Sequence, residues 1–248
     1  MTHSQKQFTG SKGGSGIAQW LISLMPAHRV YLEGCLGTGV IYSAKLPALE
    51  NILIEIDGET LTRFEQQNFE RWYRTGVTCI NGDCVAIAPT LNLPPDALAY
   101  FDPPYPGDVR EDKGRAYYAS DRRPGGTLTL EWHEAFLTML QALPCMVMVS
   151  GYECELYNRK LAKWRTSYKW TVNRAGAKVK EFVWMNFAEP ALLHDPRFVG
   201  GNFTDRQRVK RKQDRWRKNF LAMPPAERWA MYETLSSVVD DSQPEFVE

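Results

Sequence analysis

The sequence lacks any long apolar run, and only 4 of its 248 residues are histidines. A membrane-spanning helix needs about 20 consecutive, mostly apolar residues, so no segment is expected to cross a membrane. The first residues, Met-Thr-His-Ser-Gln-Lys, have no apolar core of a signal peptide. These absences favour a cytoplasmic protein.

The sequence also has few metal ligands in suitable patterns and little net charge. Its 5 cysteines include no Cys-x-x-Cys pair, and its formal net charge is only +1. The cysteines are Cys35, Cys79, Cys84, Cys145 and Cys154. They are interpreted as thiols of a reducing compartment, without a zinc or other metal site. A nucleic-acid partner must then be recognised by local basic clusters, because the global charge does not indicate one.

What the chain does contain is an alternation of apolar strand-like runs and helix-like segments. Hydrophobic residues make up 44% of the chain, enough for one large α/β domain with a small appendage. Buried strands are expected at 29–33, 51–56, 77–81, 97–101 and 145–150. Helical spacing is found over 59–73 and 132–143, whereas 168–173 and 181–187 alternate as a β-hairpin does.

An acidic residue stands at the end of four successive predicted strands. These residues are Glu33, Asp57, Asp83 and Asp102. Open α/β sheets bind ligands at the carboxyl ends of their strands. A single acid in this position is often only a helix cap, but four in succession predict a ligand site.

Two glycine-rich loops accompany these acids. The first strand runs into Gly34-Cys35-Leu36-Gly37-Thr38-Gly39, where glycines permit tight turns and close approach to a ligand. The loop does not follow the dinucleotide pattern Gly-x-Gly-x-x-Gly. The earlier loop over 8–16 carries Lys12 and leads into a helical stripe from Ile17, so it is either an anion or carboxylate site or a flexible leader. Glu55 lies near the second strand end, but strand alternation predicts that it points away from the site.

The fourth strand ends in Asp102-Pro103-Pro104-Tyr105. A strand that ends this way presents a carboxylate, a rigid backbone without amide donors at the two prolines, and an aromatic ring. A strand that runs into a Pro-rich turn has the same appearance. The surrounding acids and glycines favour a catalytic site.

Two segments are rich in basic residues. The polar stretch 107–126 interleaves basic and aromatic residues, namely Arg110, Lys113, Arg115, Tyr117, Arg122 and Arg123. This pattern suits contact with phosphates and unstacked bases, although a solvated loop explains it equally well. The second segment, from Arg206 to Lys218, holds eight basic residues and one acid, including Arg208, Arg211, Lys212 and Arg215. It is either a solvated helix face or, as we prefer, a nucleic-acid surface. Val209, Trp216 and Phe220 share one helical face, by which the helix is expected to pack.

Taken together, these motifs resemble a Dam-type adenine-N6 DNA methyltransferase of the small phage- or prophage-borne kind. The resemblance rests on Gly10–Gly16, on the glycine loop after Leu32, and on Asp102–Tyr105, in that order. Later segments of the family are resembled by Ser150-Gly151-Tyr152, by Glu181–Asn186 and by the basic C-terminal helix. It implies a Rossmann-like class I S-adenosylmethionine-dependent methyltransferase fold: a mostly parallel seven-stranded sheet with an antiparallel C-terminal hairpin and a basic helical extension. The implied organisation is a catalytic domain over 8–195, the extension over 196–238, and a disordered acidic tail over 239–248.

The resemblance also implies roles for individual residues and for the partners. S-adenosylmethionine would be held by residues of both glycine loops and by two strand-end acids, namely Lys12, Gly13, Gly14, Glu33, Gly34, Cys35, Gly37, Thr38, Gly39, Asp57, Asp83 and Cys84. Asp102, Pro103, Pro104 and Tyr105 would form the catalytic motif, with Tyr105 stacking on a base flipped out of double-stranded DNA. No metal is implied, and the oligomeric state is left open between monomer and dimer.

The chain departs from the family in two places. Gly34 and Cys35 stand where the family usually has Pro and Phe. Only 19 positions separate Asp83 from Asp102, which leaves no space for an inserted target-recognition domain. An RNA methyltransferase acting on adenine or guanine amines, and a catalytically weak DNA-binding relative, are the alternatives. A protein glutamine methyltransferase is disfavoured because that class carries Asn before Pro-Pro-Tyr.

Overall fold

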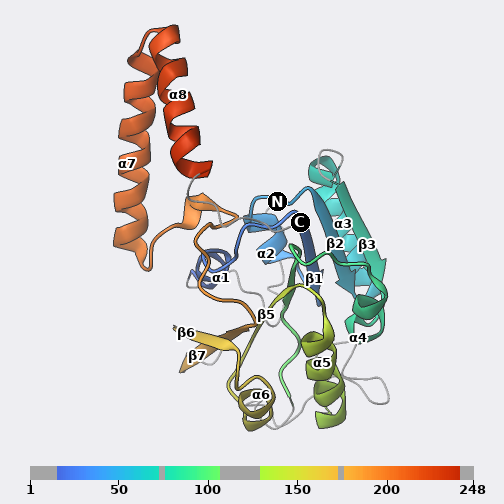
Figure 1. Ribbon diagram of the computed structural model, residues 1–248. Coiled ribbons are helices and arrows are strands. Elements are labelled where there is room, and N and C mark those ends of the chain that lie inside the picture. Colours follow the sequence, from blue (N-terminus) through green and yellow to red (C-terminus); the bar gives the residue numbers. More distant parts are fainter. Residues whose placement is uncertain (1–15, 73–75, 107–128, 173–175, 241–248) are drawn as a thin grey trace, which may run out of the picture.

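The computed structural model describes residues 16–72, 76–106, 129–172 and 176–240 (Figure 1). Its strands are β1 (Val30–Gly34), β2 (Glu50–Glu55), β3 (Gly76–Asn81), β4 (Leu98–Phe101), β5 (Met146–Gly151), β6 (Arg165–Val172) and β7 (Lys178–Met185). Its α-helices are α1 (Ile17–Ile22), α2 (Val40–Ala44), α3 (Gly58–Trp72), α4 (Cys84–Ile87), α5 (Leu130–Ala142), α6 (Glu155–Lys160), α7 (Phe203–Ala222) and α8 (Pro225–Asp240). Two short 3-10 segments are η1 (Ala88–Thr90) and η3 (Pro196–Phe198).

The described strands form one seven-stranded sheet in the order β3-β2-β1-β4-β5-β7-β6. The five strands β1 to β5 pair in parallel, and β7 runs antiparallel to both β5 and β6. This topology confirms the predicted mostly parallel sheet with an antiparallel C-terminal hairpin. The hairpin strands begin three residues earlier than their alternation suggested, at Arg165 and Lys178.

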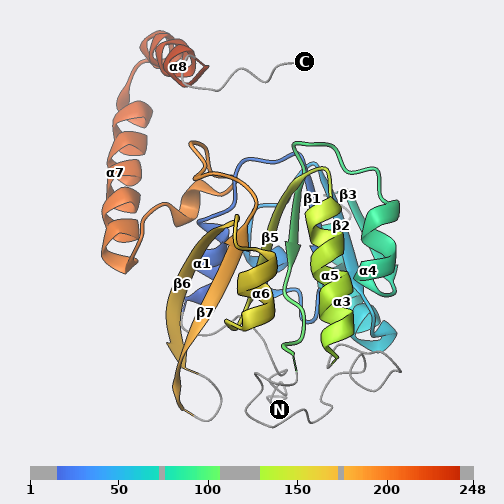
Figure 2. The ribbon, with the colours of Figure 1, turned by 60° about the horizontal axis from the view of Figure 1, so that its bottom comes forward.

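Helices cover both faces of the sheet, which is why the central strands are almost continuously apolar. All four residues of β4 are fully buried. One apolar cluster joins the sheet to α1, α2 and α3, and a second joins the opposite face to α4, α5 and α6 (Figure 2). None of the described helices is long and apolar enough to cross a membrane.

The segment after β7 returns to the edge of the sheet where β1 and β2 begin. Pro26 and Leu193 form an isolated antiparallel bridge, and the Leu46 amide donates to the buried Asp195 carboxylate at 3.0 Å. His194 stacks on His28 with ring centroids 3.8 Å apart. The C-terminal extension is therefore anchored at the amino edge of the parallel sheet.

The extension itself departs from expectation. α7 was predicted to pack by the face that carries Val209, Trp216 and Phe220, but none of its residues is buried. Because the chain leaves the amino edge at η3, α7 and α8 project away from the sheet and cannot reach its core (Figures 1 and 2). The predicted disordered tail is also corrected at its start, since α8 continues to Asp240. Residues 241–248 lie outside the described part of the chain.

Candidate active site

The parallel pairing brings the predicted strand-end residues to one edge of the sheet. Gly34 of β1 lies beside Ile54 of β2 and Phe101 of β4, and Glu55 lies beside Asn81 of β3. The residues that follow these strands, including Asp57, Asp83 and Asp102, therefore share the carboxyl edge. This is the edge opposite to the one that anchors the extension.

The loop after β1 is held by Glu55, a residue that was expected to lie away from the site. Glu55 Oε2 accepts the Gly37 amide at 2.7 Å, and Oε1 accepts the Asp57 amide at 2.9 Å. The prediction from strand alternation, that Glu55 points elsewhere, was therefore wrong. The β1 loop folds back over the end of β2, so a side chain at the last strand position reaches it. Burial raises the pKa of Glu55, and the two amide donors oppose this shift.

Three residues of the same loop have left-handed backbone conformations: Cys35 with φ 90°, Gly37 with φ 54° and Gly39 with φ 63°. A Cβ on Gly34 would lie 2.4 Å from the Phe101 ring, so packing against β4 alone demands glycine there. The thiols of Cys35 and Cys84 lie 3.5 Å apart within hydrogen-bonding range. The loop that the family resemblance assigned to the cofactor is thus also constrained by its own packing.

The acids at the ends of β2 and β3 both cap helices. Asp57 Oδ1 accepts the Glu59 amide at 3.0 Å, and Asp83 Oδ1 accepts the Val85 amide at 2.9 Å. Asp83 Oδ2 also accepts the Trp132 indole N–H at 3.3 Å. A carboxylate has about four acceptor positions, so capping leaves each of them able to accept from a ligand hydroxyl or amine.

Glu33 is buried inside β1 and hydrogen-bonded to its neighbour. The Tyr31 hydroxyl donates to Glu33 Oε2 at 2.9 Å. Burial raises the pKa of Glu33 to about 8, with a further upward contribution from the charge of Asp102 and opposing contributions from Tyr31 and Lys45. Burial therefore favours the protonated form of this carboxyl group.

Asp102 is oriented by a buried chain of hydroxyl groups. Ser150 Oγ donates to Asp102 Oδ1 at 3.1 Å, and the Tyr100 hydroxyl lies 2.8 Å from Ser150 Oγ. Ser150 and Tyr100 are fully buried. Neither residue was assigned a role from the sequence, although Ser150 belongs to the Ser150-Gly151-Tyr152 segment that carries part of the family resemblance.

Tyr105 lies in an aromatic pair beside this chain. Its ring stacks on Tyr152 with centroids 4.1 Å apart and planes 22° apart. Its hydroxyl donates to the buried Glu181 of β7 at 3.4 Å. Tyr152 and Glu181 lie in segments that carry part of the family resemblance, but the sequence assigned no role to either residue. Tyr152 directly follows β5, and Glu181 comes from β7 of the hairpin.

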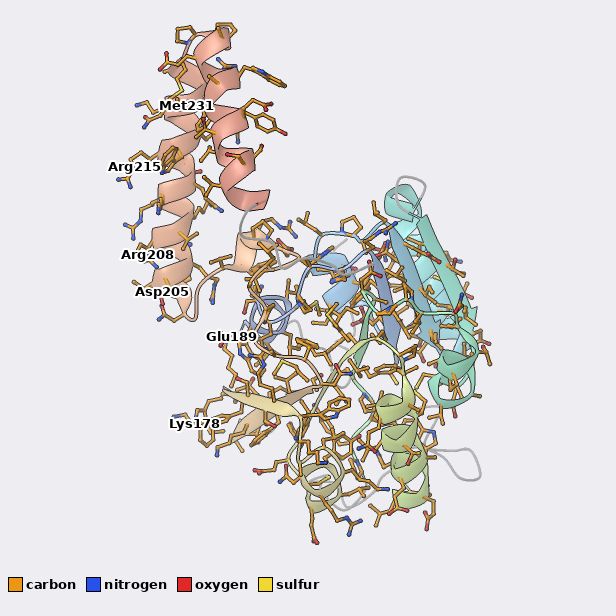
Figure 3. The ribbon with its side chains drawn as sticks, in the orientation of Figure 1. Lys178, Glu189, Asp205, Arg208, Arg215 and Met231 are labelled. Atoms are coloured by element: carbon orange, nitrogen blue, oxygen red, sulfur yellow. The ribbon has the colours of Figure 1, made fainter. Side chains whose placement is uncertain are left out.

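The other candidate residues lie apart from this edge or outside the part of the chain that the structure describes. Lys12, Gly13 and Gly14 lie outside the described residues, as does the whole basic set of the 107–126 loop. Arg208, Arg211, Lys212 and Arg215 are exposed on α7, and Arg208 and Arg215 lie on the side away from α8 (Figure 3). They are on the extension anchored at the opposite edge of the sheet from Asp102.

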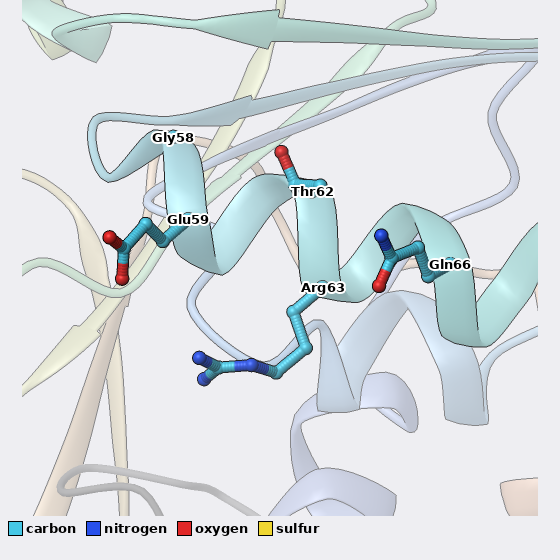
Figure 4. Close-up of a pocket in the computed structure, with 5 residues that line it drawn as sticks. All are labelled: Gly58, Glu59, Thr62, Arg63 and Gln66. Carbon is cyan, nitrogen blue, oxygen red and sulfur yellow. The ribbon is translucent and has the colours of Figure 1, made fainter.

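A separate polar hollow runs along α3. It is lined by Gly58, Glu59, Thr62, Arg63 and Gln66 (Figure 4). It begins next to Asp57, but none of the strand-end acids lines it, so we do not assign it to the site. Within the described residues, no three His, Cys, Asp or Glu side chains are grouped as a metal site requires.

No protein-family model matches the sequence, and no curated protein does. Solved structures do match the fold. The described strands form the mostly parallel seven-stranded sheet with an antiparallel C-terminal hairpin that the sequence led us to expect.

Three solved methyltransferase-fold structures illustrate the likeness. A dimethyladenosine transferase from Plasmodium falciparum is 11% identical, with 72% of this chain and 62% of that chain covered at a TM-score of 0.45. An rRNA methylase from Streptococcus thermophilus is 11% identical, with 68% and 92% covered at 0.43. A precorrin-6y C5,15-methyltransferase from Geobacter metallireducens is 10% identical, with 73% and 94% covered at 0.42. At such identities the likeness concerns the fold, and the roles of residues must be argued from the site.

The packing of the glycine loop predicts different effects at two glycines. A Cβ on Gly39 would lie 2.1 Å from the Phe64 ring, whereas one on Gly37 would meet nothing within 4 Å. Both have positive φ, so Gly37→Ala carries only the backbone cost of about 1 kcal/mol, and Gly39→Ala adds an overpacking cost of ~1–3 kcal/mol. Denaturant unfolding of the two variants measures the difference. Equal destabilisation would contradict the close approach of α2 and α3.

The raised pKa of Glu33 predicts a pH-dependent stability. Its pKa is about 8 in the folded protein and 4.5 when unperturbed. The folded state therefore retains a proton that the unfolded state loses, and this contribution to stability is lost as pH rises from about 4.5 through 8. Gln cannot titrate but still accepts from Tyr31, so Glu33→Gln should flatten the decline in thermal unfolding temperature between pH 5 and 8. Parallel wild-type and variant curves would show that Glu33 does not titrate in this window.

Proposed function

We propose that this chain transfers a methyl group from S-adenosylmethionine to the exocyclic N6 amine of adenine in double-stranded DNA. The observation that carries the proposal is the arrangement at the carboxyl edge. An Asp102-Pro-Pro-Tyr105 turn, with its carboxylate held by Ser150, stands directly beside the glycine loop of β1. The same motif, following the glycine loop in the chain, underlies the resemblance to Dam-type enzymes.

The residues at this edge fit the proposed cofactor. Gly37 has no atom within 4 Å of the position where a Cβ would be, so the loop leaves open space beside its backbone. Asp57 and Asp83 retain acceptor capacity for ribose hydroxyls and for the cofactor's adenine amine. Glu33 and Thr38 flank the same loop. Lys12, Gly13 and Gly14 complete the set by resemblance.

When bound, S-adenosylmethionine supplies a methyl group already activated by its positively charged sulfonium. The protein must then prepare the amine, whose lone pair is delocalised into the base. Asp102 and the Pro103 carbonyl would accept its two hydrogens and draw the nitrogen towards tetrahedral geometry. Positioning of this kind supplies much of the catalysis, without a metal. Ser150 fixes the Asp102 carboxylate in the orientation that this requires.

A flipped base would be held by the aromatic pair. Tyr105 and Tyr152 present parallel rings next to Asp102, and stacking on such a ring contributes ~1–3 kcal/mol per base. Pro104 keeps the edge rigid between the carboxylate and the ring.

Two basic segments would contact the nucleic-acid backbone. The 107–126 loop directly follows the catalytic motif in the chain. α7, anchored at the far edge, would contact phosphates away from the target base, so its charges should affect affinity more than the chemical step.

The central test compares Asp102→Ala, Ser150→Ala and the wild type with duplex DNA and labelled cofactor. Asp102→Ala should lower methyl transfer by on the order of 10²–10³-fold or more, with cofactor affinity by calorimetry within several-fold of the wild type. Ser150→Ala should lower kcat by about 10-fold through misorientation of Asp102. Full activity of Asp102→Ala would refute the assignment.

The same assay decides the substrate. Mass spectrometry should find N6-methyladenine in the DNA product. Transfer to structured RNA with none to DNA would replace the proposal with an RNA methyltransferase. Cofactor binding without transfer to either would indicate a catalytically weak relative.

The basic face of α7 generates a salt-dependence prediction. Arg211→Glu with Arg215→Glu should reduce the slope of log affinity against log salt by about 2, since each phosphate that is no longer neutralised lowers it by about 0.9. At saturating DNA, kcat should stay unchanged because α7 is remote from Asp102. Lys163→Glu with Lys160→Glu, two basic residues at the end of α6 and just after it, serves as a charge-matched control. An unchanged slope in the α7 variant would exclude a phosphate-facing helix.

A further inference from the structure

The helical extension exposes more apolar surface than any solvated hairpin requires. Neither the sheet nor its helices cover α7 and α8, which project from the body (Figures 1 and 2). Seven large apolar side chains on this hairpin are between 40% and 65% exposed. They are Trp216 and Leu221 of α7 and Trp229, Met231, Tyr232, Leu235 and Val238 of α8. Together they expose on the order of 700 Å², distributed over the two helices.

The hairpin of α7 and α8 is nevertheless stabilised by specific hydrogen bonds at its start and at its turn. Asn202 caps α7 by accepting the Asp205 amide at 2.9 Å. Arg228 donates to the carbonyls of Leu221 at 3.2 Å and Met223 at 3.1 Å, and so closes the turn into α8. Helices of this length draw most of their stability from packing of an apolar face. Among the described residues no side chain of α7 is buried, and the large apolar side chains of α8 are exposed, which leaves this surface available to a partner.

The apolar side chains of α8 share one half of its circumference. At 100° per residue, Trp229, Tyr232, Leu235 and Val238 fall on one side. Arg228 lies on the same side and is used within the chain, by donating to the carbonyls of Leu221 and Met223. The opposite side carries Ser237, and the acids Glu227 and Glu233 lie at the borders of the apolar half. Trp229 and Tyr232 form a ring pair 5.6 Å apart, and Trp216 and Phe220 of α7 form another at 6.1 Å. Exposed Trp and Tyr are the side chains most often found at the centre of protein interfaces.

The charges of the two helices indicate which partner fits. α7 carries eight Lys or Arg and two Asp, a formal charge of +6. α8 carries Arg228 against Glu227, Glu233 and Asp240, a formal charge of −2. A nucleic acid would be attracted to α7 but repelled by α8, and it would leave the apolar half of α8 uncovered. In a pair of identical chains, the acidic α8 of each copy can lie beside the basic α7 of the other. The apolar side chains of the two helices can then cover one another.

We propose that two copies of this chain associate through their α7–α8 hairpins as a four-helix bundle, with α8 of one copy beside α7 of the other. Such a bundle buries apolar positions of all four helices and alternates basic and acidic neighbours around its axis. A standard stable interface buries about 800 Å² per partner, which the seven side chains and their surroundings can provide. The hairpin is anchored at the amino edge, so both carboxyl edges with Asp102 stay open.

Sedimentation of the full chain across a concentration series tests the proposal. The wild type should form a species of twice the chain mass. Tyr232→Glu with Leu235→Glu should weaken self-association by on the order of a hundredfold. The matched control Ser237→Glu adds a negative charge to the opposite side of α8 and should remain dimeric. Circular dichroism compares the helix content of the variants with that of the wild type.

Charge exchange tests the pairing without disturbing the apolar face. Lys210→Glu with Arg217→Glu on α7, and Glu227→Lys with Glu233→Lys on α8, should each weaken the homodimer. A mixture of these two proteins should associate more strongly than either alone, because both contacts again join opposite charges. The mixing experiment does not use the apolar double variant, so it tests the proposal even if that variant fails to fold.

Three outcomes would overturn the proposal. One is a wild type that stays monomeric at every concentration. Another is a dimer that persists in the apolar double variant, since it would form through a different surface. The third is a monomeric wild type whose affinity for a DNA duplex falls in the apolar double variant, since nucleic acid would then be the occupant of this face.

Discussion

The hydrogen bond from the Gly37 amide to the buried Glu55 carboxylate holds the β1 loop over the carboxyl edge of the sheet. The loop cannot relax elsewhere, because Gly34 packs directly on Phe101 and Gly39 on Phe64. The second oxygen of the same Glu55 side chain accepts the Asp57 amide at the end of β2. One carboxylate therefore joins the two strand ends where a cofactor would lie.

The chemistry proposed for Asp102 depends on burial as much as on the motif. A carboxylate at the end of β4 would sample several orientations, but Ser150 and Tyr100 restrict it through a chain of buried hydroxyl groups. Glu33, a second buried carboxyl, is kept neutral by burial and by the nearby charge of Asp102. Low local dielectric makes each of these contacts stronger than it would be in water. It also makes them costly to leave unpaired.

The two ends of the parallel strands carry different features of the molecule. The carboxyl ends carry the acids, the glycine loop and the aromatic pair of Tyr105 and Tyr152. The amino ends receive the returning chain through Pro26, Leu46 and Asp195, and from there the helical hairpin departs. The basic helix α7 is thus placed at the opposite edge of the sheet from Asp102 (Figures 1 and 2). In a parallel sheet the two edges are separated by the full strand length, so no side chain bridges them.

The order of strands and helices, the β-hairpin and the four acids at strand ends could all be predicted from the amino-acid sequence. They follow from local periodicity and from the rule that parallel strands end at one edge. The folded chain was needed to establish that Glu55 supports the loop, that Ser150, Tyr152 and Glu181 join Asp102 and Tyr105, and that none of the residues of α7 is buried. Each of these depends on side chains meeting across strands or loops far apart in sequence. Periodicity predicts which face of a strand or helix a residue occupies. It does not predict which other part of the chain, such as the β1 loop or the segment after β7, will contact that face.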